Sequence, residues 1–522
     1  MTKQAFRELL TGKIICLDGA TGSNLQKRGM PNCVCPELWI TEHEDILIAL
    51  QREYVEAGSD IIYAPTFSGN RIKMREYGLA DRLDEINTKL VMLSREAAGG
   101  KAYVAGDITM TGAQLEPLGD LTFAELCDVY REQIAIIAKA GADLLVVETM
   151  MSLQETRAAV LAAREVCPDL PLMATLSFTA SGNTLYGTSA ESAVIVLQSL
   201  GVDAVGLNCS AGPDQMIDVV RRMKKVASVP LIAKPNAGLP QIGADGQTVY
   251  DMDADAFAAY MMDVADAGAD LVGGCCGTTP AYIACLKAGL LESGRMIRDT
   301  AGDRESAETC ESVTQGTSVG QNESGRQGAF AGQSESATQG TSVGQSESGR
   351  QVTSDRQSEF ATQDIPVGQN ESGSARLLYL ANDRQVYAFR DGQVLELGDG
   401  IDFRSDDELR EEYAEDVFDT AQDLAFDLQD DGADALLFCA AGLDEEADIL
   451  LAAVSEVTQI VRMPVVIASD CPETVRRVLT GYAGTAAVMP ISENPSVCEE
   501  IEKITKLYGA ALLTLDKKIR YC

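Results

Sequence analysis

One short pattern recurs four times in the first half of the chain and strongly restricts how it can fold. In each copy, helix-like sequence ends at a glycine, and a spacer residue, an aspartate and a run of apolar residues follow. This pattern is typical of a helix that a glycine terminates, a tight turn and a buried strand of a parallel sheet. The copies are "EAGSDIIYAP" at 56–65, "KAGADLLVVE" at 139–148, "SLGVDAVGLN" at 199–208 and "DAGADLVGGC" at 266–275.

Four further apolar runs lie before or between these copies, so that strand-like and helical segments alternate. Eight such units predict a closed (β/α)8 barrel over residues 1–298, with a doubly wound open sheet as the alternative. In a barrel, functional groups gather where the strands end. The further runs are "KIICLDGATG" at 13–22, "AYVAGDITMTG" at 102–112, "LPLMATLSFT" at 170–179 and "VPLIAKPNAG" at 229–238.

The chain changes character after the predicted barrel. Residues 299–376 consist mainly of Ser, Gly, Gln, Glu and Thr, and a repeat begins at Thr314, Thr338 and Thr362, at intervals of 24 residues. Stacked copies of so polar a unit would have no core to bury, so we expect a disordered linker and not a solenoid. Apolar runs and helical patterns return over 377–522. This region is shorter than the about 250 residues of a complete barrel and predicts a smaller α/β domain.

Charge and cysteine content limit the partners and the compartment. The formal net charge of −37 at pH 7 repels nucleic acid and anionic lipid, so we expect neither as a partner. The stretch "MTKQAFRELLTGKIICLDGA" has no apolar run typical of a signal peptide or a membrane span, and we expect a cytoplasmic protein. The 14 cysteines are too sparse for a disulfide scaffold, so any that cluster indicate metal binding or catalysis.

Two adjacent cysteines end the eighth predicted strand, in "LVGGCCGTTP" at 271–280. Strand side chains alternate, so Cys275 and Cys276 reach one point only if the backbone turns sharply, and the flanking glycines permit such a turn. Cys209, in "GLNCS", ends the sixth predicted strand. Three thiols at one barrel mouth fit a zinc site with three protein ligands and an open position. The alternatives are small buried hydrophobic residues, or a redox pair that leaves Cys209 without a role.

The predicted centre favours one kind of chemistry. Three thiolates leave a bound Zn²⁺ with a net negative charge, which makes it a poor Lewis acid for activating water. Such a centre suits the binding of a fourth thiol, whose pKa it lowers so that a nucleophilic thiolate results. The cysteines therefore predict alkyl transfer to the sulfur of a thiol substrate.

Four stretches, "GGCCGTTP", "GLNCS", "LDGATGSNLQ" and "APTFSGNR", resemble the homocysteine S-methyltransferase family. That family includes the homocysteine-binding module of cobalamin-dependent methionine synthase and betaine–homocysteine methyltransferase. The resemblance covers roughly residues 5–295. It implies a zinc ion on Cys209, Cys275 and Cys276.

The same resemblance implies which residues hold the substrate. Asp18 in "LDGATG" and Glu148 in "VVETM" match the acidic residues that bind the amino group of homocysteine. A zwitterionic amino acid requires a carboxylate for its ammonium. Thr66 in "PTF" and Asn208 are expected to make polar contacts. For Asp18, a turn-forming role before glycine is the alternative.

The C-terminal region has a likeness of its own. The stretch "MPVVIASDCPETVRRVLTGYAGTAAVMPIS", continued by "YGAALLTLD", is similar to the first half of a pterin-binding methyltetrahydrofolate domain, with Asp470 at its acidic position. However, "LLFCAAG" around Cys439 stands where that family has a polar strand end, and the region is short, so methyltetrahydrofolate is not expected to bind. The cobalamin signature Asp-x-His-x-x-Gly is absent from the sequence, so no intrinsic cobalamin site is expected.

Together these features predict a zinc-dependent methyl transfer to the thiol of homocysteine, giving methionine. The expected methyl donor is a separate corrinoid protein or an onium compound such as S-methylmethionine. Two alternatives stay open. One is a non-catalytic scaffold or sensor that binds homocysteine and partners a corrinoid protein. The other is a methyltransferase for a different thiol or selenol.

Overall fold

The computed structural model describes residues 1–116, 118–242, 248–294 and 377–520. The predicted linker at 299–376 lies outside the described residues. Within the described ranges, no helix combines the length and the apolar character needed to cross a bilayer.

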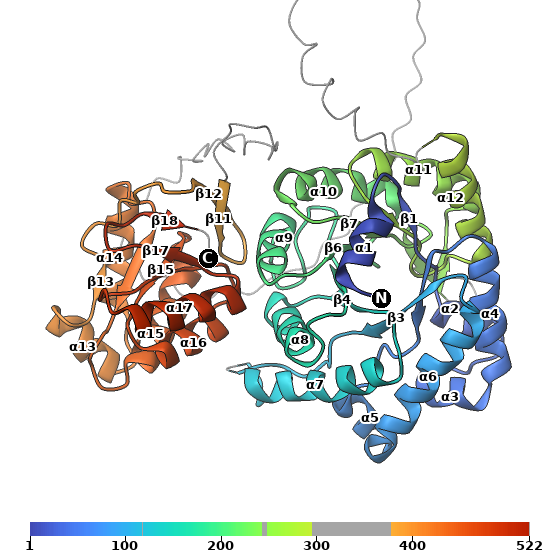
Figure 1. Ribbon diagram of the computed structural model, residues 1–522, viewed down its shortest axis with the longest axis horizontal. Coiled ribbons are helices and arrows are strands. Elements are labelled where there is room, and N and C mark those ends of the chain that lie inside the picture. The colour runs from blue at the N-terminus through green and yellow to red at the C-terminus, as the bar shows by residue number, and fades with distance from the viewer. Residues whose placement is uncertain (117, 243–247, 295–376, 521–522) are drawn as a thin grey trace, which may run out of the picture. The chain divides into compact units, whose positions relative to one another are not determined.

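Eight parallel strands surrounded by helices form the first folded part (Figure 1). The order around the ring is β1-β10-β7-β6-β5-β4-β3-β2, and a parallel bridge between Leu17 and Ile61 brings the two end strands together. The ring is a nearly closed (β/α)8 barrel, as predicted, and the open-sheet alternative is wrong. Its strands are β1 (Ile15–Cys16), β2 (Ile61–Ala64), β3 (Tyr103–Ile108), β4 (Leu144–Met150), β5 (Leu172–Leu176), β6 (Ala204–Asn208), β7 (Leu231–Lys234) and β10 (Leu271–Val272).

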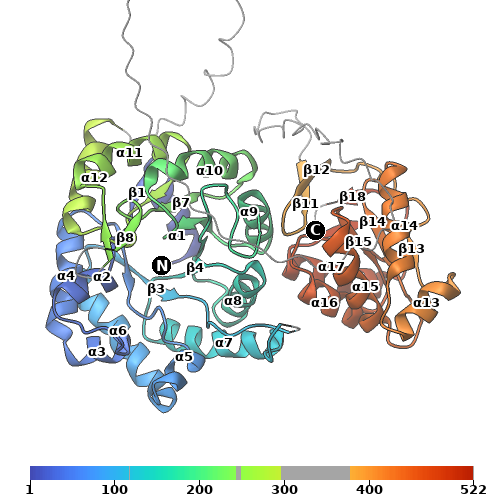
Figure 2. The ribbon, with the colours of Figure 1, turned by 180° about the vertical axis from the view of Figure 1, so that it is seen from behind.

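Helices lie around the outside of the ring, as both views of the ribbon show (Figures 1 and 2). Side chains that accept backbone hydrogen bonds start several of them, for example Thr122, which forms a capping box with Glu125. A short antiparallel hairpin, β8 (Pro240–Ile242) and β9 (Thr248–Tyr250), follows β7. The helices are α1 (Lys3–Leu10), α2 (Gly22–Lys27), α3 (Pro36–Glu42), α4 (Glu44–Glu56), α5 (Arg71–Glu76), η1 (Ala80–Arg82), α6 (Leu83–Ala98), α7 (Phe123–Lys139), α8 (Leu153–Val166), α9 (Ala190–Ser199), α10 (Pro213–Val226), α11 (Ala254–Asp266) and α12 (Pro280–Glu292).

The recurring glycine and aspartate of the sequence pattern each have a physical role. The glycine that ends each helix has a positive φ, between 80° at Gly201 and 117° at Gly268, which other residues rarely adopt. Each aspartate accepts a hydrogen bond from the backbone N–H of the first or second residue of the preceding strand of the ring. The pairs are Asp60 with Cys16 (2.9 Å), Asp143 with Val104 (2.9 Å), Asp203 with Leu172 (3.0 Å) and Asp270 with Leu231 (2.9 Å).

The inside of the ring changes from apolar to polar along the strands. An apolar cluster fills it, and Phe6 of α1 packs against that cluster. Because strand side chains alternate, the next inward position lies two residues further on. On four strands this position is polar and buried, so the C-terminal ends of the strands surround a polar layer. These residues are Asp107 on β3, Glu148 on β4, Thr175 on β5 and Lys234 on β7.

The C-terminal part is a separate, smaller α/β domain, as predicted. Its main sheet has the order β13-β14-β15-β16-β17-β18, parallel except for the last strand, and a two-stranded hairpin precedes it. The apolar runs at 436–439, 465–468, 487–489 and 511–513 form β14 to β17, whereas the hairpin, β13 and β18 were not predicted. The elements are β11 (Leu377–Ala381), β12 (Val386–Arg390), β13 (Ile401–Asp402), α13 (Asp407–Ala414), α14 (Asp419–Asp430), β14 (Leu436–Cys439), α15 (Glu446–Ile460), β15 (Val465–Ala468), α16 (Pro472–Gly481), β16 (Ala487–Met489), α17 (Pro495–Tyr508), β17 (Ala511–Leu513) and β18 (Ile519–Arg520).

Candidate metal and substrate site

Three cysteine sulfurs meet where β6 and β10 end. The Sγ atoms of Cys209 and Cys276 are 3.5 Å apart, and those of Cys209, Cys275 and Cys276 all lie within 4.8 Å of one another. All three side chains are partly buried. The structure therefore brings together the three residues that the sequence indicated as metal ligands.

The backbone after β10 explains why glycines flank the paired cysteines. Gly277 has a φ of 84°, so the chain turns directly after Cys276. A Cβ on Gly274 would lie 2.4 Å from Oγ1 of Thr278, which is too close for any other residue. The Thr278 hydroxyl in turn donates to the carbonyl of Cys275 at 2.7 Å. The turn is thus held tightly, and it directs two consecutive thiols toward Cys209.

The cysteines also interact electrostatically. Hydrogen bonds with Cys209 and Cys275 lower the pKa of Cys276 to about 3, against the effect of its burial. The same contacts raise the pKa of Cys275, so within the cluster a negative charge is favoured on Cys276. The thiolate is the form of cysteine that binds metal ions.

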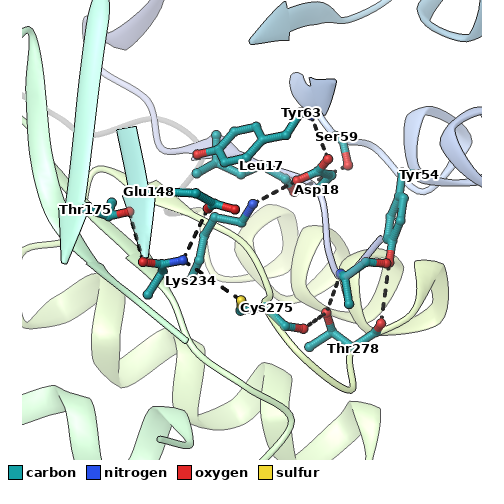
Figure 3. A network of polar contacts seen from close by, with 12 residues as sticks. Leu17, Asp18, Tyr54, Ser59, Tyr63, Glu148, Thr175, Lys234, Cys275 and Thr278 are labelled. Carbon is teal, nitrogen blue, oxygen red and sulfur yellow. Dashed lines mark hydrogen bonds and ion pairs between the residues drawn. The ribbon is translucent and has the colours of Figure 1, made fainter. Parts of the chain in front are cut away.

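A buried ion pair lies beside the cysteines in the polar layer. Nζ of Lys234 is 2.9 Å from Oδ1 of Asp18, and it lies 3.5 Å from the centre of the Tyr63 ring. The other carboxylate oxygen of Asp18 accepts the backbone N–H of Tyr63 at 2.7 Å. Figure 3 shows Lys234 extended toward Asp18, with Glu148 beside its ammonium end. Burial raises the pKa of Asp18, and the charge of Lys234 opposes that shift.

Asn208 connects the carboxylate of Glu148 to the cysteines. Its amide nitrogen lies 3.2 Å from Oε2 of Glu148, 2.7 Å from Oγ1 of Thr149 and 4.0 Å from Sγ of Cys275. Its amide oxygen accepts from the backbone of Thr149 and from the hydroxyl of Thr175, each at 3.0 Å. Thr149 has a φ of 59°, a strained conformation for a β-branched residue, and these bonds stabilise it. The amide of Asn208 is thus engaged within the protein.

Thr66 is buried at the end of β2, and its hydroxyl is also engaged within the protein. It donates to the backbone carbonyl of Asp107 at 2.7 Å and accepts the backbone N–H of the same residue at 3.0 Å. These bonds fix the position of Asp107. The contacts of Thr66 and Asn208 with substrate therefore stay predictions, while the bonds in the structure give both residues a supporting role.

Sequence reasoning missed Lys234 and Asp107. A signal for each was present: a charged residue ends the apolar run in "VPLIAKPNAG" and in "AYVAGDITMTG". Charged residues are almost never fully buried unless they are paired. A charge at an inward strand position therefore indicates a functional site or an ion pair, and the period of two along each strand places both residues inside.

The fold and the cysteine cluster together define a (β/α)8 barrel with a sulfur site at its mouth. The model of the homocysteine S-methyltransferase family matches residues 15–290, which is more than half of the chain. The chain belongs to the homocysteine S-methyltransferase family, as its motifs indicated.

Two curated relatives and one solved structure extend this comparison. The methionine synthase of Mycobacterium tuberculosis is 33% identical over 315 residues, covering 56% of this chain and 26% of that protein. The methionine synthase of Mycobacterium leprae is 32% identical over 295 residues, covering 53% of this chain and 24% of that protein. The chain thus spans about a quarter of the length of these relatives. The metallated form of the Escherichia coli homocysteine methyltransferase MmuM aligns with a TM-score of 0.46 at 23% identity, over 55% of this chain and 98% of that one.

Proposed function

We propose that this chain transfers a methyl group to the sulfur of homocysteine, giving methionine, at a zinc ion held by Cys209, Cys275 and Cys276. The observation that carries the proposal is the group of three sulfurs within 4.8 Å of one another at the mouth of the barrel. Sulfurs bound to one tetrahedral zinc, with bonds of about 2.3 Å, lie about 3.8 Å apart. The three cysteines therefore fit a zinc ion after small side-chain adjustments.

Zinc bound by three thiolates offers a fourth position to the thiol of a substrate and lowers the pKa of that thiol. The protein's own part is to hold the rest of the substrate. Glu148 provides a buried carboxylate for the ammonium group, and Asn208 orients that carboxylate relative to Cys275. With a sulfonium donor, the substrate sulfur forms the new bond to the methyl carbon. The donor leaves as a neutral sulfide, so charge and atoms balance.

The methyl donor belongs to one of two classes, an onium compound or a separate methyl-corrinoid protein. The net charge of −37 attracts a cationic donor such as a sulfonium or betaine. Methyltetrahydrofolate is not proposed as a donor. In the C-terminal domain, the end of β14 at Cys439 and Ala440 is buried and offers little polarity. Oδ1 of Asp470 already accepts the backbone N–H groups of Ile491 and Ser492.

The proposal is tested by offering homocysteine and one donor at a time to the purified, zinc-loaded protein. The donors are S-methylmethionine, betaine, a methyl-charged corrinoid protein and methyltetrahydrofolate. We expect methionine, measured by mass spectrometry, from an onium compound or the corrinoid protein and none from methyltetrahydrofolate. Homocysteine binding without methionine from any donor would contradict the proposal and favour the scaffold or sensor. Methionine from methyltetrahydrofolate would contradict our exclusion of that donor.

Glu148→Gln is expected to weaken homocysteine binding while zinc is retained. The amide keeps the shape of the side chain but loses the charge, and a hydrogen bond to a charged group contributes about 1.5–3 kcal/mol. The dissociation constant, measured by calorimetry on the zinc-loaded protein, should therefore rise about tenfold to 150-fold. Glu165→Gln is the matched control, because Glu165 is exposed on α8 and pairs with Arg131. Equal affinities of Glu148→Gln and the parent would mean that the ammonium is held elsewhere.

A further inference from the structure

The turn that carries the paired cysteines lies between β10 and α12, at 273–279, and belongs to neither element. Because glycines make this stretch flexible, contacts with other parts of the chain must fix its shape. Two of these contacts come from the segment after β7. The backbone N–H of Cys275 donates to the carbonyl of Pro235 at 2.7 Å, and the carbonyl of Cys276 accepts the N–H of Ala237 at 2.9 Å.

The loop after β1 holds the same turn through a buried hydroxyl. The carbonyl of Asp18 accepts the backbone N–H of Gly274 at 3.0 Å. The hydroxyl of Thr278, a fully buried residue, accepts the backbone N–H of Ala20 at 3.1 Å and donates to the carbonyl of Cys275 at 2.7 Å. Figure 3 shows this hydroxyl directed at the cysteine. Thr278 therefore links the loop after β1 to the peptide group of a predicted metal ligand.

A buried amide on α2 completes this link. Nδ2 of Asn24 lies 2.8 Å from the carbonyl oxygen of Thr278 and 2.7 Å from that of Ala20. It also lies 3.2 Å from the hydroxyl of Tyr54, which donates to the carbonyl of Ala20 at 2.8 Å. Only 5% of Asn24 is exposed. Burying an amide is costly unless it is hydrogen-bonded, and this amide bonds to both of the segments that must stay together.

The sulfur cluster has a physical need for such support. The three sulfurs lie within 4.8 Å of one another, and as thiolates they would repel each other. A turn free to move would separate them in the metal-free protein, and a metal ion would then have to bring them back together. Contacts that hold the thiols in place in advance lower this cost and so raise metal affinity.

We propose that Asn24 and Thr278 are positioning residues of the metal site. Together they hold the paired cysteines toward Cys209 before a metal ion binds. The inference rests on the proposed function, since it concerns affinity for the zinc ion named there. Neither side chain acts as a ligand, because the amide and the hydroxyl bond within the protein. Partners that orient metal ligands typically contribute about 10- to 100-fold to metal affinity.

The test measures the zinc affinity of the full chain by competition with a chromophoric chelator. Asn24→Ala removes the amide, and Thr278→Val removes the hydroxyl while the shape of the side chain is kept. We expect each substitution to lower zinc affinity about 10- to 100-fold. Thr278→Ser keeps the hydroxyl and should restore an affinity close to that of the parent. Asn32→Ala is the matched control, because Asn32 is exposed and bonds only to Gln26 among the contacts of its side chain.

Leu25→Ala separates positioning from a general loss of stability. Leu25 lies on the same helix as Asn24 and packs in the barrel core. Its truncation should lower the melting temperature, measured for every variant, yet leave the zinc affinity of the folded protein unchanged. The inference is overturned if Asn24→Ala and Thr278→Val bind zinc as tightly as the parent, or if Leu25→Ala loses as much affinity as they do.

Two further outcomes are decisive. If Thr278→Ser loses as much zinc affinity as Thr278→Val, the hydroxyl does not position the turn, and the inference is wrong for that residue. A parent chain that binds no zinc would contradict the proposed function itself, and this inference with it.

Discussion

Cys276→Ala is expected to lose zinc and methyl transfer together while the barrel stays folded. Mutations of residues that merely support a metal ligand already lower metal affinity about 10- to 100-fold, so removal of a ligand should lower zinc affinity by more than about 100-fold. The fold should survive, because the stability of a barrel lies in its packed interior and not in the loops at its mouth. Zinc content after gel filtration and the far-ultraviolet circular dichroism spectrum measure the two effects.

Cys285→Ala is the matched control for this experiment. Cys285 lies on α12, outside the sulfur cluster, and its thiol contacts the carboxylate of Asp255. That variant should retain one zinc ion per chain and full activity. A Cys276→Ala protein that keeps its full zinc content would contradict the assignment of this residue as a ligand.

The barrel could be predicted because its signals are local. A glycine at a helix end, an aspartate and an apolar run stand within ten residues of one another in four copies, and these four runs and four further apolar runs define the ring. What the pattern did not reveal is why the aspartate recurs. Asp60 bonds to the backbone of Cys16, 44 residues away, and that contact exists only after two strands have paired. The N-terminal strand of the C-terminal sheet, β13 (Ile401–Asp402), was missed because the residues around it are mainly glycine and charged or polar residues, so that no apolar run marks it.

The sulfur cluster was also readable from the sequence, because the glycines around Cys275 and Cys276 are a local sign of a sharp turn. The charged residues of the polar layer could not be placed from the sequence. Asp18 and Lys234 are 216 residues apart, and nothing near either residue in the sequence indicates the other. The structure shows that Asp18 pairs with Lys234, while its contact with the substrate stays a prediction. Long-range ion pairs inside a barrel depend on which strands become neighbours and on the inward register of each.

Lys234→Met is expected to lower the free energy of unfolding of the barrel by about 3–5 kcal/mol, the range found when one partner of a buried ion pair is removed. Methionine fills a similar volume but leaves Asp18 buried without a cation. Urea unfolding can be followed through the fluorescence of Trp39, which reports on the barrel because it is the single tryptophan of the chain and lies on α3. Lys89→Met is the matched control, since Lys89 forms an exposed pair with Glu44. Loss of this exposed pair should lower the free energy of unfolding by about 0–1 kcal/mol.

The double variant Asp18→Asn with Lys234→Met separates the charge from the packing. If the single variant is destabilised by the unmatched charge of Asp18, a neutral asparagine removes that cause, and the double variant should be more stable than Lys234→Met alone. If the lost contacts of the lysine stem with the Tyr63 ring were responsible, Asp18→Asn would instead lower the free energy of unfolding further. If Lys234→Met lowers the free energy of unfolding no more than Lys89→Met does, Lys234 does not stabilise Asp18.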